Sequence, residues 1–292
     1  MNIRPATKSD YAAIADLFRS VEVALLPRPT NLTADVVDGW LATVALETNT
    51  WLIEQDGELV AGAFGQLHGT RGNCAGAVRP SACGRGLGSR LVELLEERIR
   101  EEGAERIHNN ALAADDRASE LLQSRGYNDV RRFWDMAIDF DGEVPEPAVV
   151  VELFREKEAV AFHTALEEAF AEHWGHEPET FEAWWERQRK RATYDPSVWF
   201  VIRDGDEIAA VCRNDTHEAH GYIGALGVRP AWRGRGYGRA LLLHSFREFQ
   251  RRGLPRVTLG VDASNETGAT HLYDSVGMHV EMAIVVWEKM LR

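Results

Sequence analysis

Two short glycine-rich segments carry the residue pattern that most clearly predicts chemistry. They are Gly84-Arg-Gly-Leu-Gly88 and Gly234-Arg-Gly-Tyr-Gly238. Each follows an apolar run typical of a strand and precedes a run with helical periodicity. Glycines let backbone N–H groups approach an anion closely, and the free amides of a helix N-terminus add a favourable dipole. The segments therefore predict phosphate-binding loops, although glycines at this spacing are also typical of tight turns.

The glycine spacing excludes two common phosphate-binding motifs. Gly-x-Gly-x-Gly is not the Gly-x-Gly-x-x-Gly of dinucleotide-binding folds, and no Lys-Ser or Lys-Thr pair follows as in a P-loop. The loops must therefore belong to another class of fold, which the rest of the sequence has to indicate.

The two loops belong to a longer internal repeat. Matched segments occur in the same order at 51–57 with 199–205, 78–88 with 228–238, and 124–127 with 275–278. Because chance does not produce ordered matches of this kind, the chain is predicted to hold two copies of one fold. The segment Asp141–Ala148 combines acids with two prolines, which remove backbone donors, and is predicted to be a linker. We expect domains at 1–142 and 148–292.

Each copy shows the same order of elements. We expect a short strand, a helical region, a hairpin, a strand leading into the glycine loop, an amphipathic helix, a further strand, a short helix and a terminal hairpin. The expected strands are 2–4, 74–78 and 106–109, then 149–154, 223–228 and 256–261, with hairpin turns at Asp56-Gly57 and Asp204-Gly205. Strands outnumber helices and do not alternate strictly with them, so the predicted fold class is α/β with a mixed sheet.

The full string from Val228 to Gly238, Val-Arg-Pro-x-x-Arg-Gly-Arg-Gly-x-Gly, resembles the acetyl-CoA signature of the GNAT N-acetyltransferase superfamily. The run from Leu259 to Gly277 is similar to the family's second signature, Asn followed by Leu-Tyr and Gly-Phe, with Met278 replacing Phe. The resemblance covers both halves, and the arrangement resembles the mycothiol-synthase type. It implies a tandem duplication of the acyl-CoA N-acyltransferase (GNAT) fold, whose fourth and fifth strands part to admit pantetheine.

The resemblance also implies roles for single residues of the second copy. The backbone of Leu226 and Val228 would pair with pantetheine, and the Val228 amide would polarise the thioester carbonyl. Tyr273 would protonate the departing thiolate; its alternative is a half-buried aromatic whose hydroxyl meets a carbonyl. The residues implied in binding acetyl-CoA are Leu226, Gly227, Val228, Arg233, Gly234, Arg235, Gly236, Tyr237, Gly238, Arg239 and Asn265.

The two copies differ at the positions that carry chemistry. Cys83 stands where the second copy has Arg233, and Leu122 stands where it has Tyr273. Leucine cannot donate a proton, and cysteine cannot neutralise phosphate as arginine does. We predict that the N-terminal copy has lost turnover and serves as a scaffold, a substrate wall or a vestigial coenzyme site. Cys83 as a covalent nucleophile is an alternative that lacks a base nearby in the sequence.

Acyl transfer to an alkylamine requires the neutral amine. An ammonium of pKa about 10.4 is 3.4 units from neutrality at pH 7, which costs about 4.6 kcal/mol. Proteins of the mycothiol-synthase type use a Glu on the strand before the loop, but the aligned residue here is Tyr222. Glu218 and His220 are the first alternatives, although acids at a strand edge are usually solvated.

The segment Phe170–Glu179 contains two histidines, three glutamates and Trp174. In this fold the region often walls the acceptor pocket, and acids beside a tryptophan suit a cationic amine. A metal site is disfavoured because Gly175 and Pro178 interrupt the helix that would align the ligands. A solvated loop remains the other alternative.

Composition limits the function further. The 292 residues have a net charge of −13, which disfavours binding to duplex nucleic acid or to an anionic membrane. No apolar run approaches the ~18 residues of a membrane span, and the three cysteines form no disulfide or zinc pattern, so we expect a cytoplasmic protein. We predict an acetyl-CoA-dependent N-acetyltransferase without a metal, acting on the primary amine of a small molecule. The alternative is a non-catalytic acyl-CoA-binding or sensor protein.

Overall fold

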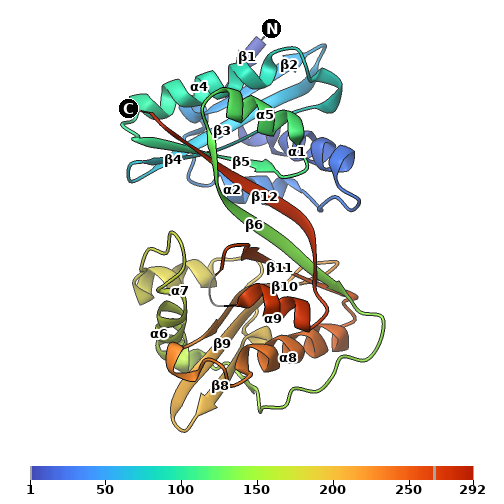
Figure 1. Ribbon diagram of the computed structural model, residues 1–292, viewed down its shortest axis with the longest axis vertical. Coiled ribbons are helices and arrows are strands. Elements are labelled where there is room, and N and C mark those ends of the chain that lie inside the picture. Colours follow the sequence, from blue (N-terminus) through green and yellow to red (C-terminus); the bar gives the residue numbers. More distant parts are fainter. Residues whose placement is uncertain (1, 266–267, 292) are drawn as a thin grey trace. The chain divides into compact units, whose positions relative to one another are not determined.

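The structure is a computed structural model that describes residues 2–265 and 268–291. The chain divides into two compact units: unit 1 is Met1–Phe133 with Glu281–Arg292, and unit 2 is Trp134–Val280. Each unit contains a mixed sheet, ordered β1-β2-β3-β4-β5-β12 in unit 1 and β7-β8-β9-β10-β11-β6 in unit 2 (Figure 1). The predicted mixed α/β class and the division into two similar units are thereby confirmed.

The elements of unit 1 are β1 (Asn2–Arg4), α1 (Tyr11–Leu25), α2 (Ala34–Leu41), α3 (Leu46–Asn49), β2 (Thr50–Gln55), β3 (Glu58–His68), β4 (Arg71–Val78), α4 (Leu87–Glu101), β5 (Arg106–Leu112), α5 (Asp116–Ser124) and β12 (His279–Met290). Those of unit 2 are β6 (Asn128–Asp139), β7 (Glu152–Leu153), α6 (Ala159–Phe170), α7 (Phe181–Arg189), β8 (Phe200–Asp204), β9 (Glu207–Thr216), β10 (Gly221–Val228), α8 (Tyr237–Arg251), β11 (Arg256–Asp262) and α9 (Ala269–Ser275). Short 3₁₀ turns at Pro80–Ala82 and Pro230–Trp232 precede the two glycine loops.

Helices cover both faces of each sheet. In unit 1, a Cβ built on Gly62 of β3 would meet Leu17 of α1, whereas one on Gly65 would meet Leu95 of α4. Because side chains on a strand alternate between faces, α1 and α4 lie on opposite sides. In unit 2, Gly227 lies against α6 and Gly221 lies against Phe249 of α8. Both units bury continuous apolar cores between these layers.

The sixth strand of each unit comes from the other sequence repeat. In unit 1, β12 pairs antiparallel with β5, from Ile284 opposite Leu112 to Met290 opposite Arg106. In unit 2, β6 lies beside β11, and the Phe140 amide donates to the Pro255 carbonyl at 2.8 Å. Each repeat therefore ends in one long strand, and the expected terminal hairpin is wrong. The two compact units consequently do not consist of the same residues as the linear segments 1–142 and 148–292.

The local elements follow the sequence closely. The β2–β3 turn is Asp56-Gly57, and both residues have positive φ. The β8–β9 turn is Gly205-Asp206, one residue later than expected, because Asp204 is still paired with Glu207. β7 is also shorter than the expected strand 149–154.

Candidate active site

The loop of unit 2 has the backbone geometry of an anion cradle. Gly234 and Gly236 have φ of +77° and +78°, a region that favours glycine, and open space surrounds both Cα atoms. Gly238 serves packing instead, because a Cβ there would lie 2.8 Å from Leu272 Cδ2 of α9. α8 begins at Tyr237, so its unpaired first-turn amides adjoin the loop. The predicted positions 233–239 thus form one continuous backbone surface.

Strands β10 and β11 separate beside this loop. They pair in parallel only from Gly221 opposite Val257 to Ile223 opposite Leu259. The Arg229 amide donates to Ala209 of β9 at 3.0 Å, so alternate residues of β10 face β9. The amides of Leu226 and Val228 therefore face the opening between β10 and β11, where an extended ligand can pair with them.

A β-bulge lies where the two strands begin to separate. Seven residues of β9 pair with the eight of β10, and the register shifts between Ile223 and Ala225. Gly224 occupies the bulge, where a Cβ would lie 2.5 Å from the Arg213 guanidinium. A bulge reverses which face successive side chains point to. It explains why Gly221 meets α8 while Gly227, also odd-numbered, meets α6.

The two arginines of the loop already have acidic partners. Arg233 donates to Glu172 at 2.8 Å and to the Ala169 carbonyl at the end of α6 at 3.4 Å. Arg235 donates to Asp204 at 3.1 Å. The Glu172 and Asp204 side chains are more than half exposed, so both ion pairs are weak and exchangeable.

Tyr273 is buried on α9, with 7% of its surface exposed. Burial raises its pKa above the ordinary value of 10.0, and the neighbouring Cys212 and Tyr222 add to the effect. Its phenol is therefore protonated at neutral pH. No residue among those described forms a hydrogen bond to its hydroxyl, so its proton is not committed to a structural contact.

A buried charge cluster lies on the α6 face of unit 2. The Asp215 carboxylate, 1% exposed, accepts hydrogen bonds from Arg191 at 2.8 Å, Arg213 at 2.9 Å and Thr193 at 2.8 Å. Sequence analysis missed this cluster because its members come from β9 and from the segment after α7. No local motif joins them.

The same face has room for a small group beside Gly260 of β11. An ideal Cβ on this exposed glycine would lie 3.5 Å from Asp135 Oδ1 and 3.7 Å from Tyr222 Oη. Burial raises the pKa of Tyr222, and the charge of Asp135 contributes next. Asp135 was not among the sequence candidates, since it lies in the strand that ends the first repeat.

The other candidate bases lie elsewhere. Glu218 is exposed in the turn before β10, and His220 stacks on His217 with ring centroids 4.9 Å apart. Both lie at the end of β10 opposite to the glycine loop. His173 follows α6, and burial lowers its pKa below 6.5, so it is neutral at pH 7. Within residues 2–265 and 268–291, no group of three or more His, Cys, Asp or Glu side chains could hold a metal ion.

The second signature lies on β11, α9 and the segment between them. The backbone N–H of Asn265 donates to the Asp262 carbonyl at 3.0 Å. Positions 266 and 267 of the signature lie outside the described residues.

Unit 1 keeps the cradle, but its strands separate one residue pair later, after Ala75 and Asn110. Gly84 and Gly86 have φ of +76° and +77°, as in unit 2. However, β4 pairs with β3 residue for residue from Arg71 to Val78, without a bulge. It also pairs with β5 over five residues, two more than the corresponding strands of unit 2.

The side chains of unit 1 also depart from the catalytic pattern. Cys83 is partly exposed, and its thiol lies 3.7 Å from the Arg79 carbonyl. Leu122 is buried in the core.

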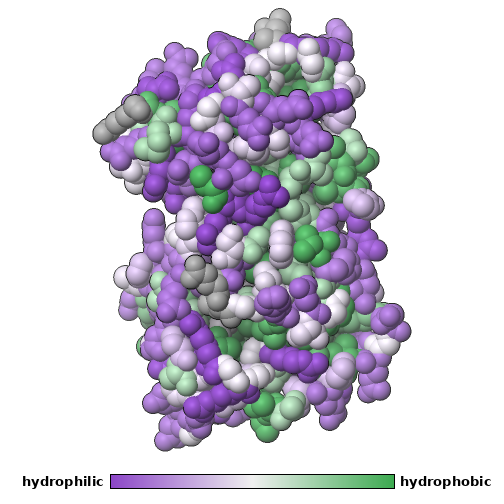
Figure 2. Space-filling view, viewed as in Figure 1, coloured by the Kyte–Doolittle hydropathy of each residue, from purple (hydrophilic) through white to green (hydrophobic). Residues whose placement is uncertain are grey.

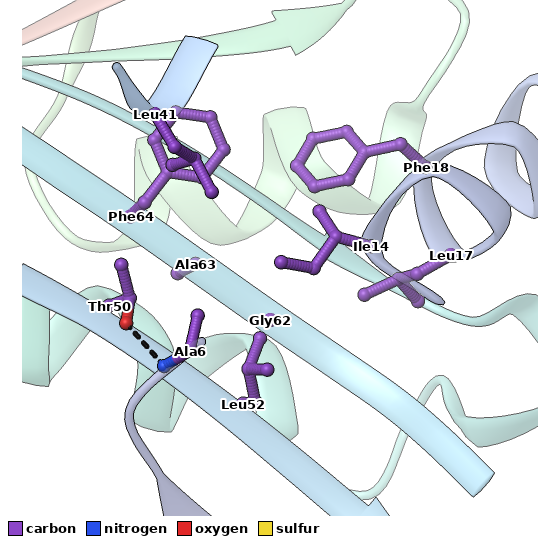
Figure 3. Close-up of a pocket in the computed structure, with 10 residues that line it drawn as sticks. All are labelled: Ala6, Ile14, Leu17, Phe18, Leu41, Thr50, Leu52, Gly62, Ala63 and Phe64. Atoms are coloured by element: carbon purple, nitrogen blue, oxygen red, sulfur yellow. Dashed lines mark hydrogen bonds between the residues drawn. The ribbon is translucent and has the colours of Figure 1, made fainter. Parts of the chain in front are cut away.

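On the α1 face of unit 1, apolar side chains leave a cavity of only about 10 Å³, roughly one water molecule in size (Figure 3). Its lining residues are Ala6, Ile14, Leu17, Phe18, Leu41, Thr50, Leu52, Gly62, Ala63 and Phe64.

The fold and the site define a tandem acyltransferase of the acyl-CoA-dependent class. The model of the acetyltransferase (GNAT) family matches residues 16–127 and again 159–278. The chain belongs to this family, and it is an N-acetyltransferase that transfers an acetyl group to an amine. Members of the family use acetyl-CoA as co-substrate.

Relatives in both sequence and structure match most or all of the chain. The mycothiol acetyltransferase of Thermobifida fusca is 29% identical over 255 residues, 77% of each chain. That of Catenulispora acidiphila is 26% identical and covers 98% of this chain and 97% of its own. A GCN5-related N-acetyltransferase from Sphaerobacter thermophilus superposes with a TM-score of 0.87 at 32% identity, covering 100% of this chain and 96% of that one. A tandem GNAT protein of the clavulanic acid pathway shares the fold at 16% identity and a TM-score of 0.73, covering 100% and 98%.

The surface is mostly hydrophilic on the face shown in Figure 2, as the charge of −13 leads one to expect. In the part of the chain that the structure describes, no helix is both long and apolar enough to cross a membrane.

Proposed function

We propose that unit 2 is the catalytic unit and transfers the acetyl group of acetyl-CoA to the primary amine of a small molecule. The observation that carries this proposal is the separation of β10 and β11 after Ile223 and Leu259, next to the glycine loop. A loop for phosphates that adjoins a gap lined by free amides suits a ligand with a pyrophosphate and a long amide-containing arm. Acetyl-CoA has both.

The glycine loop binds the pyrophosphate through its backbone amides, from Arg233 to Arg239. Arg233 then exchanges Glu172 for phosphate, which costs little because surface ion pairs contribute about 0–1 kcal/mol. The amides of Leu226 and Val228 pair with pantetheine, and the Val228 amide polarises the thioester carbonyl. Asn265 and Tyr237 flank this path.

Tyr273 acts as the general acid. Its raised pKa keeps the phenol protonated, so it can donate to the leaving thiolate as the C–S bond breaks. Unit 1 has Leu122 at the corresponding position and retains β4–β5 pairing where unit 2 opens. We infer that unit 1 has lost turnover.

The acceptor is a small amine. The names of the relatives in Thermobifida and Catenulispora make the unacetylated precursor of mycothiol the first candidate. Tyr222, at the position of the acid in that type, leaves other amines open. A panel of the mycothiol precursor, glucosamine and ethanolamine covers the chemistry.

The test is calorimetric titration with acetyl-CoA, followed by an assay of thiol release with the panel. We expect binding in unit 2 that Arg233→Glu abolishes. Arg85→Glu, the same charge reversal in the loop of unit 1 at the position that corresponds to Arg235, should leave that binding intact. If acetyl-CoA does not bind, the proposal is wrong. If acetyl-CoA binds but no amine is acetylated, the chain is a non-catalytic acyl-CoA-binding protein.

A further inference from the structure

The space beside Gly260 is lined by oxygen atoms and can hold a small polar group. Asp135 Oδ1 and Tyr222 Oη both lie within 4 Å of an ideal Cβ on this residue, so the two oxygens flank one point above the strand. Gly260 itself is exposed, so the point is open to a ligand. A carboxylate, a phenol and access from solvent are what a primary ammonium needs for binding.

This space lies where the thioester and the acceptor must meet. Gly260 is the first residue of β11 after Leu259, at which pairing with β10 ends. Tyr222 lies opposite Asp215 on β9 and Thr258 on β11, as Asn73 of unit 1 lies opposite Gln66 and His108, so unit 1 has a side-chain amide where unit 2 has a phenol. The bulge comes directly after Tyr222 and Ile223, where pairing with β11 ends, so Tyr222 lies next to the opening.

The geometry points to Asp135 as the carboxylate that holds the ammonium of the acceptor above Gly260 and takes its proton. This inference rests on the proposed function. Asp135 accepts one proton from the ammonium and releases it to solvent. The nitrogen lone pair then forms a bond to the thioester carbon. As the C–S bond breaks, its electron pair leaves with sulfur, which takes the phenolic proton of Tyr273, and the excess proton on nitrogen restores that phenol.

Unit 1 lacks every part of this arrangement. In unit 1 the Leu291 amide donates a hydrogen bond to the Glu105 carbonyl, as the Phe140 amide does to the Pro255 carbonyl in unit 2. The two hydrogen bonds fix the same register between the sixth strand and its neighbour. In this register, Asp135 lies opposite Gly260 in unit 2. The corresponding residues of unit 1 are Val286 and Asn110, so unit 1 has neither the carboxylate nor the glycine.

The charges around Asp135 come from several elements. Tyr222 lies on β10, Arg213 and Asp215 lie on β9, and Arg191 follows α7; all three charged groups influence Tyr222. Asp135 is the carboxylate of this group that lies beside Gly260, with Oδ1 3.5 Å from an ideal Cβ on that residue.

The experiment compares two acceptors in full-length Asp135→Asn. One is the alkylamine of the panel that the wild type acetylates fastest, which is charged at pH 7; the other is hydroxylamine, which is uncharged. We expect kcat/KM to fall about 100-fold or more with the alkylamine and less than about 10-fold with hydroxylamine. Acetyl-CoA affinity, measured by calorimetry, should be unchanged. Asp139→Asn is the matched control on the same strand, where Asp139 pairs with Arg256 instead.

Two further variants keep the inference falsifiable if Asp135→Asn folds poorly. Gly260→Ala adds a methyl group at ordinary contact distance, so it should fold, fill the space and lower activity with the alkylamine. Tyr222→Glu in the Asp135→Asn background returns a carboxylate to the same space and should restore at least part of the lost rate.

The outcomes separate the two proposals. A wild type that acetylates nothing overturns the proposed function, and this inference with it. A wild type active on alkylamines whose Asp135→Asn variant matches it overturns only the role of Asp135. Equal losses with both acceptors also overturn that role, because the carboxylate would then not act on the ammonium.

Discussion

Replacing Tyr273 by Phe removes the proposed general acid while leaving its ring in place. The hydroxyl is hydrogen bonded to none of the described residues, so its loss should leave no polar partner exposed and change stability by less than about 0.5 kcal/mol. General acid catalysis contributes typically about 10²–10⁴-fold, or about 2.7–5.4 kcal/mol of activation free energy. We therefore expect kcat to fall by this factor and the acetyl-CoA Kd to stay within about twofold.

The raised pKa of Tyr273 adds a pH test with a definite sign. The phenol acts in its protonated form, and its pKa lies above 10.0, so it stays protonated between pH 6 and pH 9. The wild type should show no alkaline loss of kcat from this group in that range. If an alkaline limb below pH 9 disappears in Tyr273→Phe, the burial argument is wrong.

The assay is spectrophotometric detection of released coenzyme thiol with the best amine of the panel. Tyr194→Phe is the control, because it removes the same atom in the same unit, where the hydroxyl instead donates to Glu156 at 2.8 Å. A Tyr273→Phe enzyme that keeps more than about a third of wild-type kcat, well short of the expected 10²-fold loss, would refute the assignment.

Other changes test the packing and the charges. Gly227→Ala places a Cβ 2.7 Å from the Ala169 Cβ, which cannot rotate away, so urea unfolding should show a loss of about 1–3 kcal/mol. Asp215→Asn leaves the largely buried Arg213 and the partly exposed Arg191 without their carboxylate and should cost about 3 kcal/mol by the same measurement. The hydrogen bond from Arg4 lowers the pKa of Asp10 from 3.8 to about 2. Asp10→Asn should therefore lose about 1 kcal/mol above pH 4, after allowance for solvent screening, and the difference from wild type should vanish as pH falls toward 2.

The sequence was sufficient for features that short segments determine. The glycines at 234 and 236 need positive φ, and the turn at Asp56-Gly57 needs it too, so both are visible in residue types alone. Tyr273 lies in the predicted helix because its signature is contiguous. Asp135 and Asp215 act through partners far away in the chain, and no local pattern marks them.

The exchange of sixth strands is invisible to the sequence for a different reason. Strands β6 and β12 follow the equivalent helices α5 and α9 of the two repeats. Their sequence pattern therefore does not indicate which of them pairs with β5 and which with β11. Each exchange covers an edge that would otherwise expose unpaired backbone groups. Duplicated folds permit this swap because the two edges are interchangeable.

The difference between the two units follows largely from one register shift. In unit 2, seven residues of β9 pair with β10, and Gly224 of β10 has no residue opposite it. In unit 1, eight residues of β3 pair with β4, and none is left over. By strand pairing, Gly221 corresponds to Gly72, and both face the helix that follows the glycine loop. Tyr222 corresponds to Asn73, so the phenol of unit 2 is replaced by an amide in unit 1. Unit 1, which lacks the shift, keeps β4–β5 pairing as far as Asn110, and it has Asn73 in place of the Tyr222 phenol. We therefore expect unit 1 to lack turnover because of its sheet as much as because of Cys83 and Leu122, and restoring those two side chains alone should not restore catalysis.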